Sequence, residues 1–331
     1  MTLDNAIRTS TPPPLDPELA AGLARIPFMS STLHPHEILE ARERRLNQLP
    51  DRDVQLERLR RDGSIEVTER EVPGPLGGPD ITVLIMAPTN PRTVPSPTIY
   101  YIHGGGMVMG TRFTGVDGLA DLVDELGVVA VSVEYRLAPE NPYPAPVEDC
   151  YAGLVWITEN AADLGIDSSR IIVMGASAGG GLAAAIALFA RDHNGPAISH
   201  LVLGCPMLDD RGITPSSQEL DGIGVFDRTS NKTGWGALLG DAAGGPDVSY
   251  YAAPARATDL SGLPPTFLDV GQVETFRDEV IDFAARLSQS GVLAELHVWP
   301  GAFHGFEVVV TSDISKIAGQ TRRAYIARAL S

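Results

Sequence analysis

Short runs of β-branched and apolar residues recur along the chain from residue 64 onward. We expect eight strands, at residues 64–72, 81–86, 98–102, 128–133, 171–174, 200–203, 266–270 and 295–299. A turn-rich segment joins the first two strands, which indicates an antiparallel start. The other runs are mostly apolar on both faces, as the strands of a buried, mainly parallel sheet are.

Helical patterns fill most of the gaps between these strands, at residues 116–125, 146–160, 179–191, 277–289 and 312–330. Alternation of strand and helix predicts an α/β fold in which helices flank a central, mostly parallel eight-stranded sheet. Residues 206–264 break this rhythm, with glycine-rich loops and no clear strand. We interpret them as an excursion that follows the sixth strand.

The first 60 residues show helical patterns at 16–25 and 36–46 and no strand pattern. Such a stretch resembles a lid more than the core of an α/β fold. We therefore predict a helical cap region at residues 1–60 and an α/β-domain at residues 61–331. The excursion at residues 206–264 would contribute partly to the cap.

Composition narrows the possible partners. The chain has 42 acidic and 25 basic residues, for a net charge of −17, which repels phosphate backbones and anionic membrane surfaces. We therefore expect no nucleic-acid partner.

The amino terminus carries charges and three consecutive prolines instead of the apolar run of an export signal. The longest strongly apolar stretch, at 182–190, is far shorter than the ~20 residues that span a bilayer, so we expect a cytoplasmic protein without membrane contact.

Two cysteines, Cys150 and Cys205, lie beside apolar runs. Two thiols in a chain of this length form neither a disulfide framework nor a zinc site. We expect both to be buried free thiols and expect no metal site.

One serine lies in a motif that favours nucleophilic chemistry. The sequence Gly-Ala-Ser-Ala-Gly at 175–179 follows a predicted strand and precedes a predicted helix, which is the context of the G-x-S-x-G turn. Flanking glycines let this sharp turn form, so the hydroxyl of Ser177 would project into a cleft. A glycine-rich helix start can instead bind phosphate, and this alternative stays open on the motif alone.

A second glycine motif, His-Gly-Gly-Gly at 103–106, follows the strand predicted at 98–102. A tetrahedral intermediate of acyl transfer carries negative charge on the former carbonyl oxygen, and backbone N–H groups can stabilise it. We expect Gly104 and Gly105 to supply two such donors and Ala178, the residue after the serine, to supply a third. His103 would orient this loop by hydrogen bonding.

A serine nucleophile needs a base, and the base needs an acid. His304 lies in a glycine-flanked turn after the last predicted strand, where such a base is expected. Four acids follow or end the seventh strand, namely Asp269, Glu274, Asp278 and Glu279. We favour Glu274 because it alone lies in the loop, and Asp278 is the alternative.

Together these motifs resemble the hormone-sensitive-lipase-like branch of the α/β-hydrolases, the bacterial family IV carboxylesterases. The segments Glu-Tyr-Arg-Leu-Ala-Pro-Glu at 134–140, Tyr-Pro-Ala-Pro-Val-Glu-Asp at 143–149 and Gly-Leu-Pro-Pro-Thr at 262–266 also resemble this branch. The chain departs from the family pattern at Ala176, where Asp is usual, and at Glu274, where the usual acid is Asp. The longer Glu274 side chain would need a shifted backbone or another rotamer to reach the base.

The resemblance implies an α/β-hydrolase fold with a catalytic domain at 61–331 and a helical cap. It implies a carboxylesterase that hydrolyses short-chain acyl esters of a small molecule through a Ser177-His304-Glu274 triad, without cofactor or metal. An amidase or acyltransferase on the same triad, or a non-catalytic ligand-binding relative, are the alternatives.

The strand at 295–299 could lie at a sheet edge and form a homodimer. Candidates for an apolar wall of the site are Met107, Val108, Met109, Phe226 and Trp235.

Overall fold

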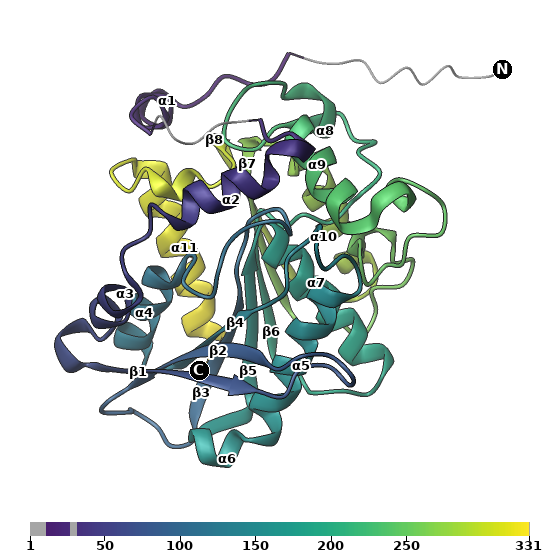
Figure 1. The fold of residues 1–331 in the computed structure, drawn as a ribbon. Helices are drawn as coiled ribbons and strands as arrows, with labels where there is room; N and C mark the ends of the chain where they lie inside the picture. Colours follow the sequence, from purple (N-terminus) through teal and green to yellow (C-terminus); the bar gives the residue numbers. More distant parts are fainter. Residues whose placement is uncertain (1–10, 27–31, 331) are drawn as a thin grey trace.

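A central sheet organises the protein (Figure 1), and the computed structural model describes residues 11–26 and 32–330. Its strands are β1 (Ile65–Val72), β2 (Ile81–Pro88), β3 (Ser96–Ile102), β4 (Val129–Glu134), β5 (Ile166–Ala176), β6 (His200–Gly204), β7 (Thr266–Val273) and β8 (Ala294–Phe303). They form one 8-stranded sheet in the order β1-β2-β4-β3-β5-β6-β7-β8. Strand β2 pairs antiparallel with β1 and β4, and every later pairing is parallel. The predicted sheet and its antiparallel start are confirmed.

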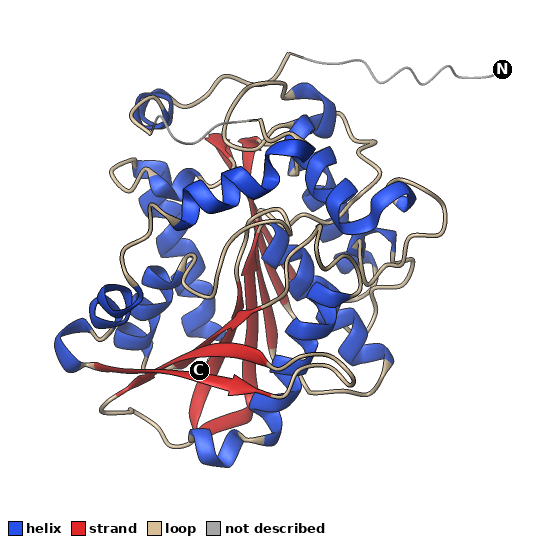
Figure 2. Ribbon diagram, in the orientation of Figure 1, coloured by secondary structure: helices blue, strands red, loops and turns tan. Residues whose placement is uncertain are grey.

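Helices cover both faces of this sheet, as Figure 2 shows. The five predicted between strands or after the last one are present as α4 (Val116–Leu126), α5 (Ala145–Glu159), α7 (Ala178–Asp192), α10 (Arg277–Gln289) and α11 (Asp313–Ala329). Apolar residues of α5, α7 and α10 belong to one core cluster, and those of α4 and α11 belong to another. Each face of the sheet therefore has its own core.

Strand β3 lies in the middle of the sheet and shows how the sequence produces two cores. All of its residues are buried. Ile99 and Tyr101 pack in the α4 and α11 cluster, whereas Tyr100 and Ile102 pack in the α5, α7 and α10 cluster. Successive side chains of a strand point to opposite faces, so a strand covered on both sides is apolar at most positions, and in β3 only Ser96 and Thr98 carry small hydroxyl side chains.

Among the helices of the described residues that the sequence did not predict, α3 (Arg52–Leu59) and α9 (Arg228–Leu239) are the longest. Helix α3 buries Leu56 and Leu59 in the core on the α4 side, although five of its eight residues are polar or charged. Helix α9 lies in the 206–264 excursion, and the Asp227 carboxylate accepts the N–H of Ser230 in its first turn. Tertiary contacts supply most of the stability of such short or glycine-interrupted helices, so their sequences need only a weak hydrophobic periodicity.

The amino-terminal helices are α1 (Pro17–Leu23) and α2 (Ile38–Leu46), close to the predicted 16–25 and 36–46. Arg42 of α2 donates to the carbonyl oxygens of Val108 at 2.8 Å and Ala138 at 2.8 Å, and pairs with Glu140. These contacts fix α2 against the loops that follow β3 and β4. Residues 1–10 and 27–31 of the predicted cap lie outside the described residues, and the boundary at residue 60 stays a prediction.

The excursion meets the amino-terminal region. The Leu33 N–H donates to Ser230 at 2.9 Å, and the Thr233 hydroxyl donates to the Leu33 carbonyl at 2.8 Å. Helices α2, α8 (Ser216–Glu219) and α9 accordingly lie together at one end of the molecule in Figure 1. Within residues 11–26 and 32–330, no helix has the length and apolar character needed to cross a membrane.

Candidate active site

Ser177 occupies a strained turn between β5 and α7. Its backbone has φ 56° and ψ −122°, in a region that residues with a side chain rarely adopt, and its N–H donates to the Gly204 carbonyl at 2.8 Å. The flanking glycines make this turn possible. A Cβ at Gly175 would lie 2.2 Å from the Gly179 carbonyl oxygen, and one at Gly179 would lie 2.0 Å from that of Ile102. The strand–turn–helix context predicted for this motif is confirmed.

The glycine loop after β3 runs directly beside this turn. A Cβ at Gly104 would lie 3.3 Å from the Cβ of Ser177. Gly105 has φ +129°, and a Cβ there would lie 2.0 Å from the Met109 carbonyl oxygen. The glycine at 105 is therefore required by the turn of the loop itself, in addition to any need for close approach by a ligand. Ala178 begins α7 and is fully buried.

His103 holds this loop in place. Its ring stacks on Tyr135 at 4.2 Å between centroids, and its Nδ1–H donates to the Gly104 carbonyl at 2.9 Å. The Tyr135 hydroxyl donates in turn to the His103 carbonyl at 2.9 Å. Burial lowers the pKa of His103, which favours the neutral imidazole. The expectation that His103 orients the loop by hydrogen bonding agrees with these contacts.

His304 and Glu274 come together from two neighbouring strands. Glu274 follows β7 directly, and His304 follows β8 directly. One carboxylate oxygen of Glu274 contacts Nδ1 of His304, and the other accepts the Gly271 N–H at 3.4 Å. The side chain of Glu274 is 1% exposed, and that of His304 is 12% exposed. Burial alone would lower the pKa of His304, but the Glu274 carboxylate favours the charged ring, so this pKa lies well above 6.5.

The other acids of this region have different partners. Asp278 accepts the Ser216 N–H at 2.8 Å and contacts Arg277. Glu279 accepts the Leu208 N–H at 2.8 Å. Their carboxylates thus bind backbone amides of the 206–264 excursion rather than those at the start of their own helix. The structure places Glu274 beside His304 and directs Asp278 elsewhere.

Asp269 is also directed away from His304. It lies within β7, where Arg322 and the Trp299 indole N–H bind its carboxylate. Arg322 also pairs with Glu307, three residues after His304. This partly buried ion pair connects helix α11 to the loop that carries His304, and so supports that loop.

Phe226 forms an apolar wall beside His304. Its ring lies 5.4 Å from the His304 ring and 5.5 Å from that of Phe276, between centroids. Its Cε2 lies 3.4 Å from the Cβ position of Gly106, so it also borders the glycine loop. Of the other proposed wall residues, Met107, Val108 and Trp235 belong to the buried core, and Met109, like Phe226, packs against it.

The sequence analysis missed the part that Cys205 plays in this region. Cys205 follows β6 with φ 36°, and its N–H donates to the Asp269 carbonyl at 2.6 Å. Its sulfur, a ring nitrogen of His304 and a carboxylate oxygen of Glu274 all lie within 4.8 Å of one another. Burial raises the pKa of this thiol to about 11. The thiol is free as expected, but Cys205 is only partly buried, whereas Cys150 is buried. The position of Cys205 after a parallel strand was the signal for a place in the site.

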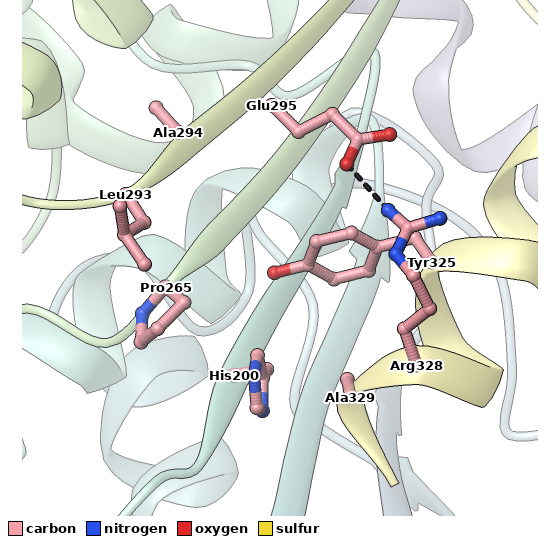
Figure 3. A pocket seen from close by; sticks show the side chains of 8 residues that line it. All are labelled: His200, Pro265, Leu293, Ala294, Glu295, Tyr325, Arg328 and Ala329. Atoms are coloured by element: carbon pink, nitrogen blue, oxygen red, sulfur yellow. Dashed lines mark hydrogen bonds and ion pairs between the residues drawn. The ribbon is translucent and has the colours of Figure 1, made fainter. Parts of the chain in front are cut away.

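A cavity of about 380 Å³ lies at the opposite end of the strands (Figure 3). Pro265 precedes β7, and His200 and Ala294 begin β6 and β8, so these lining residues mark the amino ends of the strands. Figure 3 shows the Tyr325 ring and the Arg328–Glu295 ion pair at its edge. Ligands of open α/β sheets bind at the carboxyl ends of the strands, where Ser177, Glu274 and His304 lie.

Comparison with known proteins identifies the family. A model of the family described as an alpha/beta hydrolase fold matches residues 99–308. Esterase LipI of Mycobacterium tuberculosis is 34% identical over 92% of this chain and 91% of its own, and carboxylesterase NlhH of the same species is 36% identical over 89% of each chain. The solved structure of a bacterial heroin esterase has 39% identity and a TM-score of 0.86, covering 96% of this chain and 98% of its own.

The fold and this constellation of residues are those of an α/β-hydrolase. The chain belongs to the hormone-sensitive-lipase-like branch of that family, the family IV carboxylesterases, and is a carboxylic ester hydrolase.

Proposed function

We propose that the enzyme hydrolyses short-chain acyl esters of small molecules through a Ser177-His304-Glu274 triad. The contact between Glu274 and Nδ1 of His304 carries this proposal. It fixes the ring with its Nδ1–H toward the carboxylate, which leaves Nε2 as the acceptor for the serine proton. The strained turn at Ser177 presents the hydroxyl at the carboxyl ends of the strands, as nucleophilic attack requires.

The reaction proceeds in two steps. Ser177 attacks the ester carbonyl while His304 takes its proton, and the alcohol leaves after His304 returns that proton to it. Water then attacks the acyl-enzyme in the same way and releases the acid. The N–H groups of Gly104, Gly105 and Ala178 stabilise the oxyanion in both steps, and one such donor typically contributes about 2.7–4 kcal/mol.

Phe226 supports the preference for short acyl chains. Its ring lies against both His304 and the glycine loop, so it narrows the space beside the reacting carbonyl. Two hydrogen bonds join α9 to Leu33, which precedes α2, and these segments form the cap in this proposal. A compact, capped site excludes long acyl chains by shape.

Hydrolysis of p-nitrophenyl esters of increasing acyl length tests the proposal. We expect the highest kcat/KM with short chains and loss of turnover in Ser177→Ala. We include heroin among the test substrates because one similar solved structure is that of a heroin esterase. Anilide analogues and alcohol acceptors test for amidase or acyltransferase activity instead. Wild-type turnover equal to that of Ser177→Ala would refute the triad and favour a ligand-binding role.

Two further expectations belong with this proposal. β8 is at one end of the strand order, so it offers an edge for a homodimer, which sedimentation analysis can test. The cytoplasmic location stays a prediction of the amino-terminal sequence.

A further inference from the structure

Three side chains that follow adjacent strands converge in the candidate active site. Cys205, Glu274 and His304 directly follow β6, β7 and β8, which are neighbours in the sheet. Their sulfur, oxygen and nitrogen atoms lie within 4.8 Å of one another. Glu274 is buried, and Cys205 and His304 are partly buried. The proposed ester hydrolysis uses the carboxylate and the imidazole but assigns no part to the thiol.

This set has the chemistry of a site for a borderline-soft divalent cation. Zinc binds thiolate sulfur at about 2.3 Å, imidazole nitrogen at about 2.0–2.1 Å and carboxylate oxygen at about 2.0–2.2 Å. Ligand atoms at those distances from one ion are separated by less than the 4.8 Å found here. The carboxylate and imidazole are already in contact, so binding needs only small side-chain movements.

We propose that Cys205, Glu274 and His304 form an inhibitory zinc site within the active site. The ion replaces the proton between Glu274 and Nδ1 of His304 and takes Cys205 as its thiolate ligand. The imidazole proton moves to Nε2, and the thiol proton is released to solvent, so one proton leaves for each ion bound.

Bound zinc inhibits the enzyme because it changes which nitrogen of His304 carries the proton. This consequence rests on the proposed triad, because a ring protonated at Nε2 cannot accept the Ser177 proton. The ion also separates Glu274 from the ring that it orients. The His304 side chain is 12% exposed, so the ring is accessible to an ion from solvent.

Zinc titration of the esterase rate tests this site. The wild type, Cys205→Ala and Cys150→Ala are compared, each relative to its own rate without zinc. Cys150 is the control because it is the other free thiol and lies in α5, away from this site. Loss of even an outer partner of a metal ligand lowers affinity roughly 10–100-fold, so Cys205→Ala should need at least about tenfold more zinc for half inhibition. The Cys150→Ala response should match the wild type, and a chelator should restore activity in all three.

A second readout separates failure of this site from failure of the proposed function. Cadmium bound to a thiolate absorbs in the ultraviolet by charge transfer, which requires no turnover. We expect this band in the wild type and Cys150→Ala, and not in Cys205→Ala. Equal zinc inhibition of all three proteins, or a cadmium band that survives Cys205→Ala, would overturn the site while leaving the triad intact. His36→Ala serves as a further control, because His34 and His36 stack at the surface and could bind zinc.

Discussion

The carboxylate of Glu274 contacts Nδ1 of His304 although the two residues lie 30 positions apart in the chain. The same carboxylate accepts the Gly271 N–H, three residues back on the strand that it follows. The glutamate thus reaches the ring at a position where the family pattern has aspartate.

This contact predicts a large difference between two acidic residues. Glu274→Gln should lower kcat by roughly 100- to 10,000-fold, because the ring loses the charge that fixes its tautomer and stabilises its protonated form. Asp278→Asn should retain most activity, since Asp278 binds Ser216 and Arg277 instead. The assay is p-nitrophenyl acetate hydrolysis, with circular dichroism to verify folding. A greater loss from Asp278→Asn would move the acid to that position.

The pH dependence of kcat/KM should reflect the titration of the His304 ring. The neutral ring is the base, and Glu274 raises its pKa well above 6.5, so activity should rise with pH through a midpoint above 6.5. In Glu274→Gln the carboxylate is absent, while burial still disfavours the charged ring. The midpoint should therefore move to lower pH in the residual activity of this variant. An unchanged midpoint would show that the Glu274 charge does not act on the titrating group.

Gly179 is a test of close packing behind the nucleophile. A Cβ there would lie 2.0 Å from the Ile102 carbonyl oxygen, so Gly179→Ala must push α7 away from β3. We expect a loss of about 1–3 kcal/mol in the free energy of unfolding and a fall in esterase rate. Gly118→Ala in α4 is the control, because no atom lies within 4 Å of its added Cβ.

That control should stabilise the protein by roughly 0.5–1 kcal/mol, since alanine favours a helix interior over glycine. Urea unfolding followed by circular dichroism measures both variants. If both substitutions changed stability alike, contact between α7 and β3 would not be the reason for glycine at 179.

Phe226 provides a test of acyl-chain selection. Phe226→Ala removes the ring beside His304 and the glycine loop, so longer acyl chains should gain kcat/KM relative to acetate. The measurement is the ratio of kcat/KM for octanoate and acetate esters in the variant and the wild type. Trp235→Phe is a comparison variant in the core, where the ratio should stay near the wild-type value. A fall in both rates without a change in their ratio would assign Phe226 to packing alone.

Much of the fold could be predicted because its strands are short, apolar and separated by amphipathic helices. A strand covered on both faces, such as β3, is a nearly continuous apolar run that is shorter than a typical helix. Helices α3 and α9 escaped prediction because their amphipathic pattern is weak and their neighbours hold them. For α3 these are the residues around β1, which bury Leu56 and Leu59.

The sequence by itself determined the turn at Ser177, the glycine loop and the candidate base, because each depends on residues adjacent in the chain and on glycines that their backbones require. Tertiary structure decided which acid faces His304, which aromatic ring borders it and that Cys205 lies beneath it. These relationships join ends of different strands, and spacing along a chain does not specify the direction of a side chain after its strand ends. Parallel strands bring Cys205, Glu274 and His304 together because their carboxyl ends share one edge of the sheet.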